Sequence, residues 1–231
     1  MDGNILDLVS DPLFGISLTV IVYALLAKLR QIYPWINIMF FSVVIIIGVL
    51  FLFNIPYDAY EQGGEMITFM LGPATIALGV PLYKEGQNIT SNAHILLGGI
   101  TIGSLIAIVS AIGLTWLFIG TDEIMLSMIP KSATTPISIV IADNLGGSQG
   151  LAASFTALTG VFGALSGPEI MKKVGIHHDL AIGSALGTSS HGLGTARAIT
   201  TSRLQGSVSG FSMALTGIIT SLLVIPLYWI F

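Results

Sequence analysis

The feature that most limits how this chain can fold is a series of long stretches with almost no charged side chains. A helix needs about 20 residues to cross the hydrocarbon core of a bilayer. The stretches are 12–27, 33–57, 66–83, 95–121, 144–168 and 204–231, with near-complete ones at 124–142 and 180–196. Only 9% of the residues are charged, against roughly 25% in soluble domains. The chain is therefore predicted to be a polytopic all-α integral membrane protein, a helical bundle of 7–8 segments.

The ends and the composition exclude several other classes. The first residues, MDGNILDLVSD, are acidic and do not resemble a cleaved signal peptide. The chain has no cysteine, which excludes disulfides, thiol nucleophiles and Cys-based metal sites. No basic patch indicates a nucleic-acid partner.

The chain also shows a pattern of internal duplication. Adding 115 to a residue number places LGPATIALGVPLY (71–83) over LGTSSHGLGTARA (186–198), with four identities in thirteen positions. The same offset superposes the other apolar stretches of the two halves. We therefore expect a single transmembrane domain, 1–231, made of two repeats, about 1–120 and 121–231.

Each half carries a segment that Pro or Gly interrupts. Proline removes a backbone donor and clashes with the preceding turn, and glycine leaves helical geometry cheaply. Paired broken helices are the sequence pattern of a secondary transporter whose site lies near the bilayer midplane. The expected helix breaks are Pro73, Pro81, Pro130, Pro136, Gly187, Gly192 and Gly194.

The positions of the basic residues predict the orientation. Lys28 and Arg30 follow the first span, so the positive-inside rule places that loop in the cytoplasm and the N-terminus outside. Eight crossings would leave Lys172 and Lys173 outside. If 124–142 enters and leaves on one side, there are seven crossings and the second half is inverted. We favour seven crossings and an inverted repeat. Against this, the stretch that the offset places over 124–142 is the first span, which has the pattern of a full crossing.

Three side chains within or at the edge of the apolar segments can carry positive charge: Lys131, His191 and Arg197. A charge at the bilayer centre costs at least about 2.5–3.5 kcal/mol, so the default interpretation is functional. The alternatives are snorkelling of Lys131 or Arg197 to the interface, and an interhelical hydrogen bond for His191. Hydroxyl side chains cluster around these groups. The candidate ligand residues are Lys131, Ser132, Thr134, Thr135, Ser189, Ser190, His191, Thr195, Arg197 and Thr75.

The signs of the intramembrane charges favour an anionic ligand. The apolar segments contain no Asp or Glu, which a cation transporter would need. A metal site needs several converging ligands, so we expect no metal and no cofactor. Ser189 and Ser190 lie beside His191, but no buried Asp is available to orient the His. We therefore expect no enzyme activity.

Four blocks together resemble the LrgB/CidB family of bacterial membrane proteins. They are FMLGPATIALGVPLYK (69–84), PKSATTPI (130–137), LTGVFGALSGP (158–168) and LGTSSHGLGTARA (186–198). The resemblance implies one of two functions. The family was named for its link to murein hydrolase activity and autolysis, with holin- or antiholin-like behaviour proposed alongside a small LrgA/CidA-type membrane partner. Plastidial relatives transport glycolate and glycerate, and bacterial members are tied to pyruvate movement.

The sequence thus favours a secondary transporter of small monocarboxylates such as pyruvate, glycolate, glycerate or lactate, in the bacterial cytoplasmic membrane. Lys131 or Arg197 would pair with the carboxylate, the hydroxyls would bind the ligand or opened backbone, and His191 would bind the ligand or carry a coupled proton. We expect a homodimer. The alternative is a holin-like regulator of autolysis acting with an LrgA/CidA-type partner.

Overall fold

The computed structural model describes residues 11–33, 36, 38–70, 73, 76–77, 79–118 and 120–229. All secondary structure in these residues is helical, as predicted. Four helices are long and apolar enough to cross a membrane: Pro12–Ile32, Ala93–Phe118, Gln149–Lys173 and Arg203–Trp229. The count of 7–8 segments and the duplication stay predictions. The chain forms two compact units, Met1–Ala77 and Leu78–Phe231, which are described separately.

The first unit consists of α2 (Pro12–Ile32), α3 (Ile38–Leu52) and α4 (Tyr57–Phe69). Asp11 caps α2 by accepting a hydrogen bond from the Leu13 amide at 2.8 Å, and Pro12 provides the preset φ of a first helical residue. Helices α2 and α4 cross at Gly15 and Gly63, where neither position has room for a Cβ. Small residues at a crossing let two backbones approach closely in a membrane.

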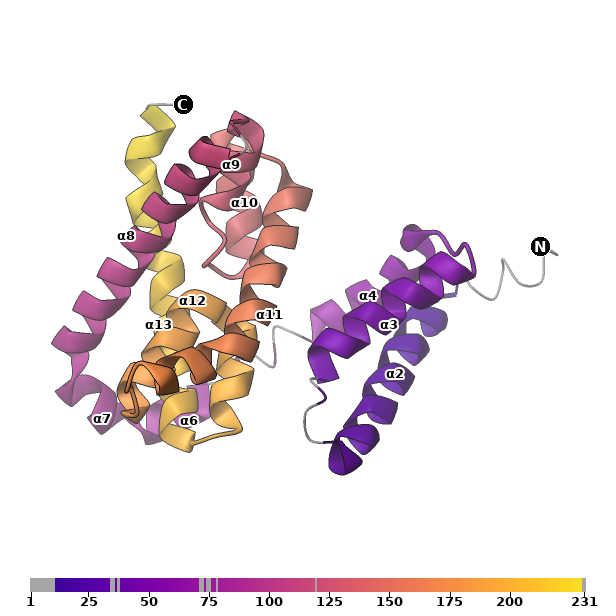
Figure 1. Cartoon of the computed structure of the whole chain (residues 1–231), viewed down its shortest axis with the longest axis horizontal. Helices are drawn as coiled ribbons and strands as arrows, with labels where there is room; N and C mark the ends of the chain where they lie inside the picture. Colours follow the sequence, from indigo (N-terminus) through magenta and orange to yellow (C-terminus); the bar gives the residue numbers. More distant parts are fainter. Residues whose placement is uncertain are drawn as a thin grey trace. The chain divides into compact units, whose positions relative to one another are not determined.

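The second unit contains α6 (Gly79–Lys84), α7 (Gly86–Ser91), α8 (Ala93–Phe118), α9 (Asp122–Met128), α10 (Thr135–Leu145), α11 (Gln149–Lys173), α12 (Asp179–Ile199), α13 (Arg203–Val224) and η1 (Ile225–Trp229). Figure 1 shows α8, α11 and α13 as the long helices of this unit, with α9 and α10 near one end and α12 near the other. Helix α11 joins the two ends, since it starts directly after α10 and ends just before α12.

Helices α9 and α10 form a hairpin that enters and leaves at one end of the unit. Beyond the end of α10, the Ser148 amide donates to the Ser127 hydroxyl on α9 at 2.7 Å, and the Ser127 hydroxyl donates to the Glu123 carbonyl at 2.6 Å. Residues 129–134 form the tip. There the Ser138 hydroxyl donates to the Pro130 carbonyl at 2.5 Å, which satisfies a backbone group that the break leaves open.

Helix α12 is also a hairpin, because the chain reverses at His191. Gly187 before the reversal packs against the Ser209 carbonyl, with no room for a Cβ. After the reversal, the Thr195 hydroxyl lies 2.9 Å from the hydroxyl of the same Ser209. Residues 179–190 and 192–199 are therefore two arms that lie side by side along α13. The apolar stretch 180–196 has the length of a span but returns to the end at which it entered.

Two hydrogen bonds to the Asp179 carboxylate, here called the clasp, hold the base of the α12 hairpin. The Asp179 carboxylate, at the start of the first arm, accepts a hydrogen bond from the Ser202 hydroxyl at 2.7 Å and another from the Gln205 side-chain amide at 2.8 Å. These bonds, that from Gln205 foremost, hold the pKa of Asp179 below its ordinary value. The start of the hairpin is thus tied to the first turn of α13, the helix that follows the end of its second arm.

The clasp gives a prediction for pH. Because the folded pKa of Asp179 is depressed, its stabilising contribution is complete above the ordinary aspartate pKa and is lost as the pH falls through the folded pKa. We expect Asp179→Asn to lower the melting temperature in detergent at neutral pH and to remove part of the acid sensitivity. Melting curves of the wild type and variant between pH 7 and pH 3, two settings that bracket the ordinary aspartate pKa of about 3.9, test this. Equal acid sensitivity of the two proteins would contradict it.

Candidate functional site

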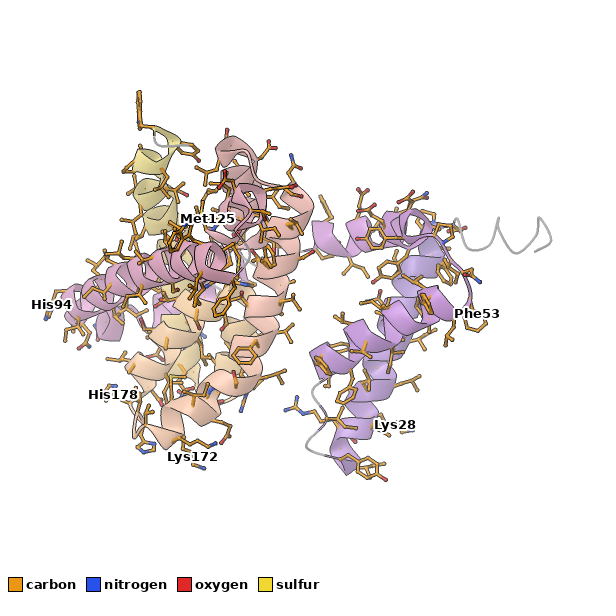
Figure 2. All side chains as sticks on the ribbon, turned by 45° about the horizontal axis from the view of Figure 1, so that its top comes forward. Lys28, Phe53, His94, Met125, Lys172 and His178 are labelled. Carbon is orange, nitrogen blue, oxygen red and sulfur yellow. The ribbon has the colours of Figure 1, made fainter. Side chains whose placement is uncertain are left out.

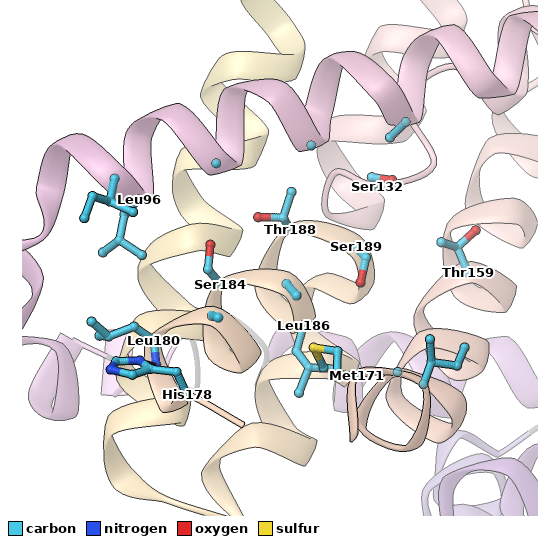
Figure 3. Close-up of a pocket in the computed structure, with 18 of the residues that line it drawn as sticks. Leu96, Ser132, Thr159, Met171, His178, Leu180, Ser184, Leu186, Thr188 and Ser189 are labelled. Carbon is cyan, nitrogen blue, oxygen red and sulfur yellow. Dashed lines mark hydrogen bonds between the residues drawn. The ribbon is translucent and has the colours of Figure 1, made fainter. Parts of the chain in front are cut away.

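The two hairpins enter the second unit from opposite ends of α11, and residues of both tips line one cavity. A cavity of about 840 Å³ lies beside the tips. Residues from both tips line it, together with α8 and α11 (Figure 3). The cavity is bordered by helices that the tertiary contacts join directly, with α12 packed on both α8 and α11.

The inner part of the cavity is polar. Ser132 comes from the α9–α10 tip, Thr159 from α11, and Thr188 and Ser189 from the first arm of α12, with Ser184 one turn further along that arm (Figure 3). Lys131 lines the same space, half-buried. The remaining lining residues include the apolar group Ile95, Leu96, Ile170, Met171, Leu180 and Leu186.

Among the described residues that line the cavity, Lys131 is the one Lys or Arg, and none is Asp or Glu. Its ammonium group has no hydrogen-bond or ion-pair partner within the described part of the chain; the one salt bridge found there joins Arg203 to Glu85 at 3.5 Å. The two prolines on either side of the tip explain this position. Pro130 lies in the tip and Pro136 in the first turn of α10, so the chain cannot continue as one helix past Lys131.

Two helix N-termini also lie at the tips. Helix α10 starts at Thr135 and its N-cap, Thr134, makes no side-chain capping bond. The second arm of α12 starts directly after His191. Helix N-termini carry partial positive charge and unpaired amide donors. Together with Lys131 they make the local field at the tips suited to an anion.

The structure brings together some of the sequence-predicted residues and not others. Lys131, Ser132 and Ser189 line the cavity, whereas Thr134, Thr135, Ser190, Thr195, His191 and Arg197 are not among its lining residues. Arg197 lies at the end of the second arm of α12, where its guanidinium donates to the Thr200 and Thr201 hydroxyls at 3.2 and 3.1 Å. Arg197 therefore lies at the base of the hairpin and away from the cavity, as the snorkelling alternative for this residue would have it.

His191 and Thr195 instead hold the α12 tip. The Nε2–H of His191 donates to the Thr156 carbonyl at 2.9 Å, and the Thr195 hydroxyl donates to the His191 carbonyl at 2.9 Å. Ser190 is buried against Gly163 of α11, and its hydroxyl lies 2.9 Å from that of Ser189.

The expected helix breaks are distributed as follows. Gly187 and Gly194 are contact points at which neighbouring backbone leaves no room for a Cβ, and the exposed Gly192 directly follows the reversal. Pro73 is exposed and Pro81 belongs to α6. Thr75 and most residues around Pro73 lie outside the described residues.

Sequence reasoning did not single out Thr159, Ser184 and Thr188 as ligand candidates. Ser184 and Thr188 are four residues apart and so share one face of a helix, which is a signal that the sequence carried. Thr159 has no such signal, because a lone threonine in an apolar helix most often bonds to its own backbone.

The long apolar helices and the two hairpins, whose tips line one open cavity in the second unit, define a helical membrane protein. The chain belongs to the LrgB-like family, which it matches over residues 19–230. It is 37% identical over 206 residues to the uncharacterized protein YwbG of Bacillus subtilis (strain 168), covering 88% of this chain and 91% of the relative.

Two further relatives extend the match. The uncharacterized protein YxaC of the same strain is 34% identical over 218 residues, covering 94% of this chain and 95% of YxaC. An uncharacterized protein of Haemophilus influenzae (strain ATCC 51907 / DSM 11121 / KW20 / Rd) is 36% identical over 188 residues, covering 81% of each chain. No solved structure matches the chain.

Proposed function

We propose that this protein is a secondary transporter of small monocarboxylate anions of the pyruvate, glycolate, glycerate and lactate class. One observation carries the proposal: Lys131, whose ammonium group has no partner within the described part of the chain, lines a cavity together with hydroxyls from both hairpin tips. An unpaired lysine inside a membrane protein is costly, and its cost is offset when an anion binds.

The hydroxyls complete the proposed site. A carboxylate has two oxygens that accept several hydrogen bonds, and Ser132 and Ser189 supply donors from opposite hairpins. Broken helices that direct their N-termini at an anionic substrate are the recurrent solution in secondary transporters. A holin-like pore needs no site of this kind.

The basic residues set the proposed orientation. In the second unit, Lys84, Lys172, Lys173, Arg197 and Arg203 belong to the end at which α8 and α13 begin and α11 finishes, and Lys172 and His178 mark this end in Figure 2. The opposite end carries Asp122, Glu123 and Asp143. By the positive-inside rule the basic end is cytoplasmic. The exposed His178 and the start of α8 line the cavity mouth, so the cavity opens to the cytoplasm.

The orientation predicts which introduced cysteines react from each side of the membrane. The chain has no cysteine of its own, so any labelling comes from the introduced thiol. Ser184→Cys, on the cavity wall, should react with a membrane-impermeant maleimide in inside-out vesicles and not in intact cells. Asn144→Cys, exposed at the acidic end, should show the opposite pattern. Reaction of Ser184→Cys in intact cells would contradict a cavity open to the cytoplasm.

Uptake by purified protein in liposomes tests the function itself. We expect saturable uptake of radiolabelled pyruvate or glycolate that unlabelled short monocarboxylates compete. Arg197→Ala should change the half-saturation concentration by less than about fivefold, because its partners are exposed hydroxyls. Non-saturable uptake accompanied by leakage of an enclosed dye would favour the holin-like alternative and contradict the transporter.

A further inference from the structure

The backbone of His191 adopts dihedral angles that are unfavourable for any residue with a Cβ. Its φ is 40° and its ψ is −126°, in a chain whose other described non-Gly residue with positive φ is Asn54. Glycine reaches such angles without steric cost, whereas a residue with a Cβ holds them only where surrounding contacts over-determine the geometry. The contacts of His191 therefore have to explain why the reversal is made here.

The imidazole ring supplies those contacts on one side. It is 6% exposed, and its Nε2–H donates to the Thr156 carbonyl of α11 at 2.9 Å. On the other side, the His191 carbonyl accepts from the Thr195 hydroxyl, which also lies 2.9 Å from the Ser209 hydroxyl of α13. One residue thus connects the tip to α11 through its ring and to α13 through its carbonyl.

Helix α11 has a notch that fits this ring. A Cβ at Gly160 would lie 2.6 Å from Cε1 and 2.9 Å from Nε2 of His191, closer than real Cβ contacts come. A Cβ at Gly163, one turn along, would meet the side chain of Ser190. The two glycines share one face of α11, so the notch receives the whole tip.

We infer that His191 is a positioning residue, which pins the α12 tip in the glycine notch of α11 and thereby fixes the side chains of Thr188 and Ser189 in the cavity. His191 is not among the cavity-lining residues, while Thr188 and Ser189, three and two residues before it, line the wall. The effect on a carboxylate rests on the proposed function. The pin itself does not.

Gly160→Ala tests the pin while leaving His191 in place. The added methyl group should displace the ring from the Thr156 carbonyl. Gly150→Ala is the matched control, since a Cβ at Gly150 on the same helix meets nothing closer than 4.0 Å. We expect hydrogen exchange of the tip amides, residues 188–192, to rise at least about tenfold in Gly160→Ala and to stay unchanged in Gly150→Ala. Equal exchange in both variants would overturn the pin.

His191→Gly tests the pin by removing the imidazole ring itself. Glycine accepts the backbone angles, so the reversal is kept while the ring is removed. We expect faster exchange of the tip amides and a half-saturation concentration raised on the order of tenfold or more, with accumulation driven by a pH gradient retained at saturating substrate. Loss of gradient dependence at unchanged affinity would make His191 a proton carrier and overturn the positioning role.

The two proposals fail in different ways. If the wild type takes up no carboxylate, the proposed function fails, but the exchange comparison still decides whether His191 pins the tip. If the wild type transports and exchange at the tip is insensitive to both variants, the pin fails alone.

Discussion

Lys131→Met should abolish high-affinity carboxylate uptake while making the protein more stable. Truncating one partner of a buried charged contact costs about 2–5 kcal/mol, so the half-saturation concentration should rise by roughly 30-fold or more. In the free protein the same ammonium group is desolvated without a partner. Methionine is also unbranched and fills similar space, but it carries no charge to desolvate. The melting temperature in detergent should therefore rise.

The control is Lys172→Met, because Lys172 is exposed in the last turn of α11 and does not line the cavity. It should leave both uptake and melting temperature near the wild-type values. Opposite movements of function and stability distinguish a ligand residue from a structural one. Lys131→Met with wild-type uptake, or with a strongly lowered melting temperature, would contradict the assigned role.

Gly194→Ala should prevent the α12 hairpin from forming. A Cβ at Gly194 would lie 2.7 Å from the Ser190 Cβ and even closer to the Leu186 carbonyl oxygen on the facing arm. A backbone carbonyl cannot move aside as a flexible side chain can, so the two arms would have to separate. We expect a destabilisation above about 4 kcal/mol, seen as loss of the monodisperse peak in size-exclusion chromatography.

Gly192→Ala is the matched comparison, two residues away on the same arm. A Cβ there meets nothing within 4 Å, so the variant should fold and elute as the wild type does. If both variants fold equally well, the two arms do not lie side by side and the hairpin is wrong.

The sequence predicted the helical membrane character because charge-free stretches of span length leave few other folds. It also located the α9–α10 break, since Pro130 and Pro136 are local signals that act within a few residues. The return of α12 has no comparable local signal. It depends on contacts between Asp179 and Ser202 and between Gly187 and Ser209, which are distant in sequence.

The site residues divide in the same way. The sequence marked Lys131 as unusual because a lone charge among apolar residues is visible in one dimension. The sequence could not show that Arg197 and His191 lie outside the cavity, because both residues belong to the same motif as Ser189, which lines it. Only the reversal at His191 directs Ser189 into the cavity, turns the His191 ring into α11 and returns Arg197 to the base of the hairpin.

The central claim is that a short carboxylate binds between the two hairpin tips at Lys131. Protection of the Ser184→Cys thiol tests it most directly, because Ser184 lies on the cavity wall between the tips and the mouth. We predict that pyruvate or glycolate slows maleimide labelling of this thiol in a saturable way, that glycerol does not, and that Lys131→Met removes the protection. A labelling rate that is independent of carboxylate, or equal protection in Lys131→Met, would contradict the claim.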